Sequence, residues 1–314
     1  MTTIEVPLDS KLRLLTFADE QGRARLGIVR PDGHVTDVAE AARRADRWLG
    51  FDGTSMRALI EGGAEALAEV RELAEMVPHG GFNISAVRIL PPLPRLNGNI
   101  FCVGWNFPEH FSEGAAFRDP NQKLPEHPVF FSKGVAALNG PFDPIPYDAA
   151  ISAQIDWEAE LGVVIGRRGK NISEFEALDY VFGYTAINDV SARDVQKSRH
   201  GGQWLKGKSL DGTAPMGPWI VPAGEFDASA VRIVTRVNGA VKQDGNTRDM
   251  HFRIPRVIAE LSRGMTLQPG DVISTGTPPG VGMGRTPPEW LKPGDVLETE
   301  IEGIGTMRNV IREA

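Results

Sequence analysis

The chain has almost no cysteine: Cys102 is the single one among 314 residues. One thiol cannot form a disulfide within the chain or build a cysteine-based zinc site. Long apolar runs are missing too, since none approaches the roughly 20 residues that a transmembrane helix requires. The N-terminal sequence MTTIEVPLDSKLRLL has no basic segment followed by an apolar stretch, so it does not resemble a signal peptide. We therefore expect a cytoplasmic globular protein without a membrane partner.

Positive charge is in the minority. The 34 Lys and Arg residues stand against 41 Asp and Glu residues, which gives a net charge of −7. Such a chain has no general electrostatic attraction for nucleic acid, so no nucleic-acid partner is expected, although a local basic pocket is compatible with this charge. Apolar residues make up 41% and charged residues 24%, which excludes a disordered or fibrous chain.

The length predicts two domains, at about 150 residues per domain. Residues 1–90 are predicted to form a small α+β domain, because short strand-like segments precede helical apolar spacing from Thr54 to Met76. Gly62-Gly63 is expected to divide that helical stretch. Residues 91–99 begin with the sequence PPLP and form a stiff, extended connector. Residues 100–314 then form the larger domain.

The larger domain is mostly strand-like. Asn238-Gly239 lies between two strand-like runs and is a strong hairpin signal. One helix is expected from Ile254 to Leu261, ending near Gly264. The segments with strand character are IDWEAELGVVIG, YVFGYTAIND, PWIVPAG, VRIVTRV, DVISTG and DVLETEI. These features predict an α+β fold dominated by strands.

Acidic residues alternate with apolar ones in the segment DWEAEL. On a strand, this alternation places Asp156, Glu158 and Glu160 on one face. Convergent carboxylates repel each other unless a cation lies between them, and oxygen ligands suit Mg²⁺, Mn²⁺ or Ca²⁺. Asp189, at the end of a neighbouring apolar run, can supply a third ligand. On these residues alone, a solvated strand face and a helix N-cap at Asp189 are the better interpretations.

Two further places carry groups suited to catalysis. His110 and Glu113 lie one turn apart if their segment is helical, and a carboxylate beside an imidazole is a common arrangement for activating water. Lys208 can stabilise an oxyanion. Each has an ordinary alternative, a surface histidine with an incidental neighbour and a solvent-exposed lysine, which the residues alone favour.

A Gly/Pro loop, Thr275–Gly282, follows a strand-like segment. Its backbone amides can form an anion-binding nest. It is not a dinucleotide-binding fingerprint, because Arg285 stands where the third glycine of that motif is required and prolines precede it.

The order of these features resembles the fumarylacetoacetate hydrolase family. The resemblance covers roughly residues 100 to 310 and rests on six blocks: CVGWNFPEHFSEG, HPVFFSKG, IDWEAELGVVIG, YTAINDVSARDVQ, KGKSLDGTAPMGPWIV and STGTPPGVG. It implies a rolled mixed β-sheet, usually in a homodimer. A fourth metal-ligating aspartate found in longer members has no match around Trp105-Asn106-Phe107. The chain therefore groups with the smaller acylpyruvase and fumarylpyruvate hydrolase-like members.

The resemblance also implies roles for single residues. Mg²⁺, or Mn²⁺ or Ca²⁺, is expected to be bound by Glu158, Glu160 and Asp189. A water-activating pair is expected at His110 and Glu113, with Lys208 as the stabilising lysine. The residues expected to contact the substrate are Gln196, Thr277 and His200, the last standing where longer members have a tyrosine.

The expected function is a metal-dependent hydrolase of aromatic catabolism that cleaves a C–C bond in a 1,3-dicarbonyl acid such as an acylpyruvate or fumarylpyruvate. The partner is then a small keto acid. The alternative is a decarboxylase or isomerase of oxaloacetate-like or hydroxymuconate-like dioic acids on the same metal site. A catalytically inactive metal-binding module is a third interpretation, and the intact His110, Glu113 and Lys208 argue against it.

Overall fold

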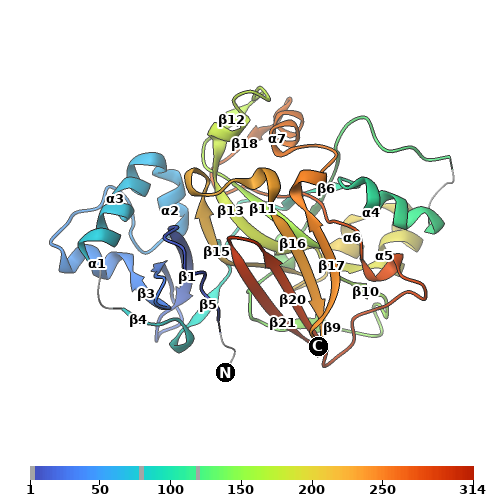
Figure 1. Ribbon diagram of the computed structural model, residues 1–314, viewed down its shortest axis with the longest axis horizontal. Helices are drawn as coiled ribbons and strands as arrows, with labels where there is room; N and C mark the ends of the chain where they lie inside the picture. Colours follow the sequence, from blue (N-terminus) through green and yellow to red (C-terminus); the bar gives the residue numbers. More distant parts are fainter. Residues whose placement is uncertain (1–3, 78–80, 118–120) are drawn as a thin grey trace.

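A large mixed β-sheet runs through the molecule. The computed structural model describes residues 4–77, 81–117 and 121–314. In this part of the chain the sheet has twelve strands, ten of them in the order β4-β3-β2-β1-β15-β13-β11-β19-β6-β7, with β5 paired to β1 and β8 to β15. Most neighbours are antiparallel, whereas β19 and β6 run parallel, as do β15 and β8. Figure 1 shows the N-terminal strands and helices on the left and the rest of the chain on the right.

The strands of the large sheet have the following bounds: β1 (Arg13–Ala18), β2 (Ala24–Val29), β3 (His34–Asp37), β4 (Phe82–Asn83), β5 (Arg88–Leu90), β6 (Ile100–Gly104), β7 (Val129–Lys133), β8 (Leu138–Asn139), β11 (Ala159–Ile165), β13 (Val181–Asn188), β15 (Ala214–Pro222) and β19 (Val272–Ser274).

A second sheet of five strands packs against the large one. Its order is β17 (Ala240–Asn246), β16 (Arg232–Val237), β20 (Val296–Ile301), β21 (Gly305–Glu313) and β9 (Ile145–Tyr147). Two short ribbons pair β10 (Ile155–Asp156) with β14 (Ser191–Ala192) and β12 (Gly169–Lys170) with β18 (Thr266–Leu267). The α-helices are α1 (Val38–Arg44), α2 (Met56–Glu61), α3 (Gly63–Met76), α4 (Pro108–Glu113), α5 (Arg193–Ser198), α6 (Leu205–Lys208) and α7 (Ile254–Ser262).

Strands β11 and β15 of the large sheet are buried on both faces. Successive side chains of a strand point to opposite faces, so each of these strands contributes to two cores. In β11, Leu161 and Val163 belong to the core shared with the five-stranded sheet, whereas Val164 belongs to the core beneath helices α1 to α3. In β15, Trp219 and Ile220 divide in the same way. Strands with two buried faces read as continuous apolar runs, which explains why LGVVI has no polar residue.

Several local predictions are confirmed. The helical stretch divides at Gly62, where α2 ends and α3 begins. Asn238 and Gly239 have φ values of 52° and 80° and connect β16 to β17 as a tight hairpin. Helix α7 ends just before Gly264, whose φ is 77°. The predicted α+β fold, dominated by strands, is therefore present.

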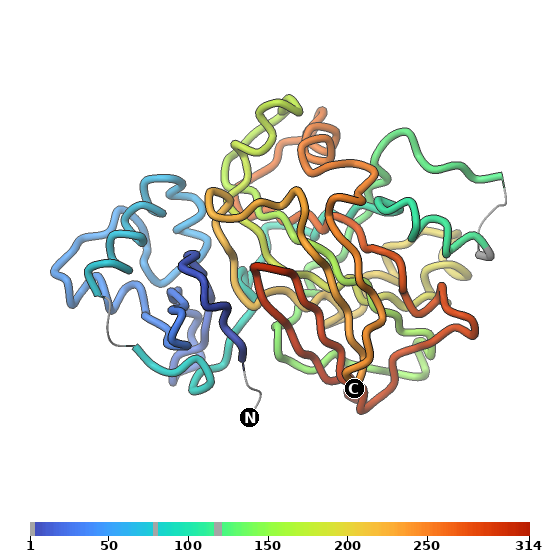
Figure 2. Tube along the Cα trace, viewed as in Figure 1, coloured from blue at the N-terminus to red at the C-terminus, as the bar shows by residue number. Residues whose placement is uncertain are grey.

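The first ninety residues share a sheet with the rest of the chain. Strand β1 pairs with β15 at Leu14 and Ile220, and both residues lie in the core that helices α1 to α3 cover. The predicted connector, residues 91–99, falls in the irregular segment between β5 and β6, and the division into domains at this point stays a prediction. Figure 2 follows the chain through this junction. Among the described residues, no helix combines the length and the apolar character needed to span a membrane.

Gly183→Ala is expected to lower the free energy of unfolding by about 1–3 kcal/mol, the range typical of overpacked interiors. Gly183 lies in β13 between β11 and β15, and an added Cβ would collide with the carbonyl oxygen of Val221. Chemical denaturation measures the change. Gly224→Ala is the matched control, because no atom lies within 4 Å of a Cβ built there and its φ is not left-handed. Equal losses in the two variants would contradict this packing argument.

Candidate metal centre and active site

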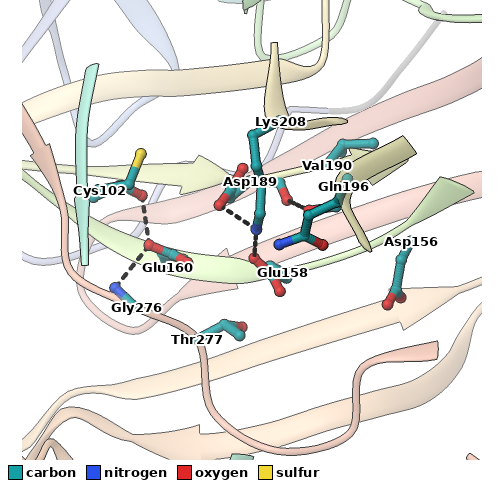
Figure 3. Close-up of polar contacts among 12 residues, drawn as sticks. Cys102, Asp156, Glu158, Glu160, Asp189, Val190, Gln196, Lys208, Gly276 and Thr277 are labelled. Atoms are coloured by element: carbon teal, nitrogen blue, oxygen red, sulfur yellow. Dashed lines mark hydrogen bonds and ion pairs between the residues drawn. The ribbon is translucent and has the colours of Figure 1, made fainter. Parts of the chain in front are cut away.

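Three carboxylates gather at one end of two paired strands. Glu158 directly precedes β11, Glu160 lies within it, and Asp189 directly follows β13. The antiparallel pairing of Ala159 with Asn188 brings these positions together. One ligand oxygen from each of Glu158, Glu160 and Asp189 lies within 4.8 Å of the others, and all three residues are buried (Figure 3). Burial rules out the solvated strand face, and Asp189 does not cap helix α5, whose N-cap is Ala192.

Asp156 does not join this cluster, and its place on the same strand face as Glu158 and Glu160 stays a prediction. The strand partner changes along this segment: Asp156 in β10 pairs with β14, whereas Ala159 in β11 pairs with β13. The two residues between them lie outside both strands, which interrupts the alternation. Figure 3 shows Asp156 apart from the three carboxylates.

Three buried basic side chains contact the cluster. Lys208 Nζ lies 2.5 Å from Glu158 Oε2 and 2.7 Å from Asp189 Oδ2. Lys133 Nζ, at the end of β7, lies 2.9 Å from Asp189 Oδ1. Arg193 Nη2 donates to Glu158 Oε1 at 2.6 Å, and its Nε donates to Asp156 at 2.8 Å. Although burial opposes it, the charges of Arg193 and Lys208 hold the pKa of Glu158 well below its usual range.

Sequence reasoning missed Lys133 and Arg193. Both lie in the blocks that carry the family resemblance, in HPVFFSKG and YTAINDVSARDVQ. A lysine that ends an apolar run and an arginine between small residues are weak signals by themselves. What distinguishes them from surface residues is their burial, with relative exposures of 0% and 3%, and this burial follows from the fold.

Glu160 differs from its two neighbours because no ion pair joins it to a basic side chain in the described residues. It accepts hydrogen bonds from Ser274 Oγ at 2.6 Å and from the Gly276 amide at 2.7 Å. Burial, together with the negative charges of Asp189 and Glu158, raises the pKa of Glu160 to about 8. An all-oxygen donor set with one carboxylate lacking a cationic partner fits a divalent cation, which Glu158, Glu160 and Asp189 would hold.

Helix α4 brings the histidine–glutamate pair to the same place. His110 Nδ1 lies 2.7 Å from Glu113 Oε1, and His110 Nε2 lies 4.0 Å from Glu158 Oε1. The second oxygen of Glu113 accepts a hydrogen bond from the Gly280 amide at 2.7 Å. The imidazole is thus oriented through one nitrogen and presents the other to the carboxylates, an arrangement suited to proton transfer.

His110, Glu158 and Glu160 line the same cavity, whose volume is about 240 Å³. His110, Lys208, Gln196 and Thr277 line it together with Glu158 and Glu160, and its apolar wall consists of Trp105, Phe131, Trp204 and Met283. The Thr277 hydroxyl donates to the Ala159 carbonyl at 2.9 Å and accepts from Gln243 at 2.7 Å, so it already holds the loop in place. Gln196 accepts from Arg193 at 3.1 Å.

His200 is not among the lining residues. Its side chain is exposed, and it occupies a tight turn with φ values of 53° at His200 and 64° at Gly201. Gly202, two residues further on, lines the cavity instead. A contact between His200 and substrate therefore stays a prediction that this arrangement does not support.

The backbone amides of the predicted anion-binding loop donate hydrogen bonds to carboxylate side chains of the protein itself. The Gly276 amide binds Glu160, the Gly280 amide binds Glu113, and the amides of Gly282 and Met283 bind Asp156 at 2.6 and 3.1 Å. One loop therefore orients a candidate metal ligand, the partner of His110 and the partner of Arg193.

Known proteins resemble the chain over most of its length. The family model described as "Fumarylacetoacetate (FAA) hydrolase C-terminal" matches residues 99–312. Oxaloacetate tautomerase YisK of Bacillus subtilis (strain 168) is 39% identical over 297 residues, covering 92% of this chain and 96% of that protein. Mitochondrial oxaloacetate tautomerase FAHD2A of Homo sapiens is 41% identical over 266 residues, covering 83% and 82%. The solved structure of a fumarylacetoacetate hydrolase from psychrophilic Exiguobacterium antarcticum has a TM-score of 0.77 at 37% identity, covering 96% of this chain and 100% of that one.

Glu160→Gln is expected to weaken Mn²⁺ binding by more than the roughly 10–100-fold that losing an outer-shell partner costs, because it removes a ligand charge. Calorimetric titration of the metal-depleted protein measures this. Glu109→Gln is the control, since Glu109 is exposed on helix α4 and lies outside the cluster. Equal Mn²⁺ affinity in wild type and Glu160→Gln would show that the cluster is not the metal site.

Proposed function

The chain belongs to the fumarylacetoacetate hydrolase family, and from this premise we propose that it is a metal-dependent tautomerase of oxaloacetate-like dioic acids. The reaction interconverts the keto and enol forms of the acid. Relatives about 40% identical carry the name oxaloacetate tautomerase, which supports the isomerase alternative of the sequence analysis over C–C bond hydrolysis.

The observation that carries the proposal is the position of His110. Its Nε2 faces the carboxylate cluster from 4.0 Å while Glu113 holds its Nδ1. Tautomerisation requires one proton to move between a carbon and an oxygen of the same substrate, with no bond cleavage and no water consumed. A single oriented imidazole beside the substrate meets that requirement.

His110, Glu113 and Lys208 have different roles in this proton transfer. A divalent cation such as Mg²⁺ or Mn²⁺, when bound, would supply positive charge that stabilises the enolate oxygen. His110 Nε2 takes the proton from the carbon next to the keto group, and the C–H electron pair becomes the C=C bond of the enol. The π electron pair of the C=O bond moves onto its oxygen, and the proton returns from His110 to that oxygen. Glu113 keeps the ring oriented, and the buried ammonium of Lys208 adds positive charge near the developing enolate.

Hydrolysis of acylpyruvate-like acids is the second candidate function. The same pair, His110 and Glu113, can take its proton from a water, and a similar solved structure carries the name fumarylacetoacetate hydrolase. The two functions differ in the atom from which Nε2 removes the proton.

His110→Ala is expected to lower kcat for oxaloacetate tautomerisation by about 10²–10⁴-fold, the usual contribution of a general acid–base group. Glu113→Gln should cost less, because the ring remains. The decay of the enol absorbance, measured above the buffer-catalysed rate, follows the reaction. Mn²⁺ affinity should be unchanged, since His110 is not a proposed ligand.

His127→Ala serves as the control for this experiment, because that imidazole is largely exposed and lies outside the cavity lining. Unchanged tautomerisation in His110→Ala would remove the basis of the proposal. Cleavage of acylpyruvates by the wild type at a higher kcat/KM than tautomerisation would instead favour the hydrolase.

We also propose a homodimer, which the family resemblance implies. Light scattering is then expected to give twice the chain mass of 34.1 kDa at micromolar concentration. A mass of one chain under these conditions would refute the dimer.

A further inference from the structure

The loop from Gly276 to Gly284 contacts Glu113 at two points. The first is the hydrogen bond from the Gly280 amide to Glu113 Oε2 at 2.7 Å. Because Glu113 Oε1 lies 2.7 Å from His110 Nδ1, both oxygens of this carboxylate are engaged. A carboxylate held at both oxygens has a fixed orientation, and its contact with Nδ1 in turn fixes the orientation of the His110 imidazole.

The second point is Gly284, where the lack of a side chain leaves space for Glu113. A Cβ built at Gly284 would lie 2.8 Å from both Cδ and Oε2 of Glu113 and 2.9 Å from its Cγ. These are the three nearest atoms, and real Cβ atoms essentially never approach that closely. The φ of Gly284 is not left-handed, so its backbone accepts alanine. Space for the Glu113 carboxylate therefore explains glycine at this position, and backbone strain does not.

Gly280 is constrained differently. Its φ is 102°, and a Cβ there would collide with the carbonyl oxygen of Lys242. Replacing Gly280 would disturb the backbone itself, whereas the three atoms nearest to a Cβ at Gly284 all belong to the Glu113 side chain. Gly284 is thus the position at which the contact can be tested without altering the loop.

We propose that Gly280 and Gly284 are positioning residues for His110: the Gly280 amide fixes the Glu113 carboxylate, and the missing side chain at Gly284 leaves the room that this carboxylate requires. This inference rests on the proposed function, in which His110 moves the proton. The same loop holds Glu160 through the Gly276 amide at 2.7 Å. The proton-transfer pair and a candidate metal ligand therefore share one backbone frame.

The test is Gly284→Ala. Its methyl group displaces Glu113, so kcat for tautomerisation is expected to fall by up to about 10²-fold, as a small misplacement of a reacting group can cause. KM, Mn²⁺ affinity and the thermal unfolding midpoint should stay near the wild-type values, which a merely structural defect would not allow. Gly224→Ala, which adds the same methyl group in open space, should behave as wild type.

A double-mutant cycle shows whether the methyl group acts through Glu113. In the Glu113→Ala background, Gly284→Ala should cause no further loss, because the side chain that the methyl group meets is gone. Losses that simply multiply would overturn the proposal.

Hydrogen exchange of the Gly280 amide gives a readout that does not depend on activity. Its protection should fall in Gly284→Ala and in Glu113→Ala, because both remove the acceptor from the amide. Unchanged protection in both variants would overturn the positioning role. Lost protection with full tautomerase activity in both would instead overturn the catalytic role of the pair, so the two failures are distinguishable. Glu113→Ala tests the contact without any change in the loop.

Discussion

Mutual repulsion among the carboxylates of Glu158, Glu160 and Asp189 is the constraint on which the arrangement of the surrounding elements depends. Removing a carboxylate from water costs several kcal/mol, and two like charges nearby add to that cost. The compensation comes from separate elements: Lys133 from β7, Lys208 from α6, Arg193 from α5 and the Gly276 amide from the loop after β19. Helices α5 and α6 lie beside each other on the right of Figure 1.

The basic side chains are shared unequally among the three carboxylates, and this inequality bears on metal binding. Glu158 contacts Lys208 and Arg193, and Asp189 contacts Lys208 and Lys133. Among the described residues, Glu160 has no such ion pair and accepts hydrogen bonds from a hydroxyl and an amide. A site built for stability alone would pair every buried charge. Glu160, which has no ion pair to a basic side chain among the described residues, is the carboxylate whose charge a bound divalent cation would neutralise.

Sequence predicted the features that depend on local order. The Asn238-Gly239 hairpin and the division of the helix at Gly62 follow from backbone preferences of glycine and asparagine. Features that depend on which strand lies beside which were not predicted. Asp156 lies outside the cluster; its strand β10 pairs with β14, whereas β11 pairs with β13, and a period-two argument holds only within one continuous strand. Lys133 and Arg193 were overlooked for the same reason, since their burial is a property of the assembled sheets.

The lining of the cavity bears on which proton the imidazole takes. The apolar part of the lining includes Trp105, Phe131, Trp204 and Met283, and the Trp204 ring packs edge-to-face against the rings of Trp105 and Phe131 at ring-centre distances of 5.0 and 5.2 Å. Such a wall offers few hydrogen-bond partners, and an ordered water requires two to four of them. This apolar lining supports the proposed tautomerase, in which His110 takes its proton from the substrate carbon and no water is activated.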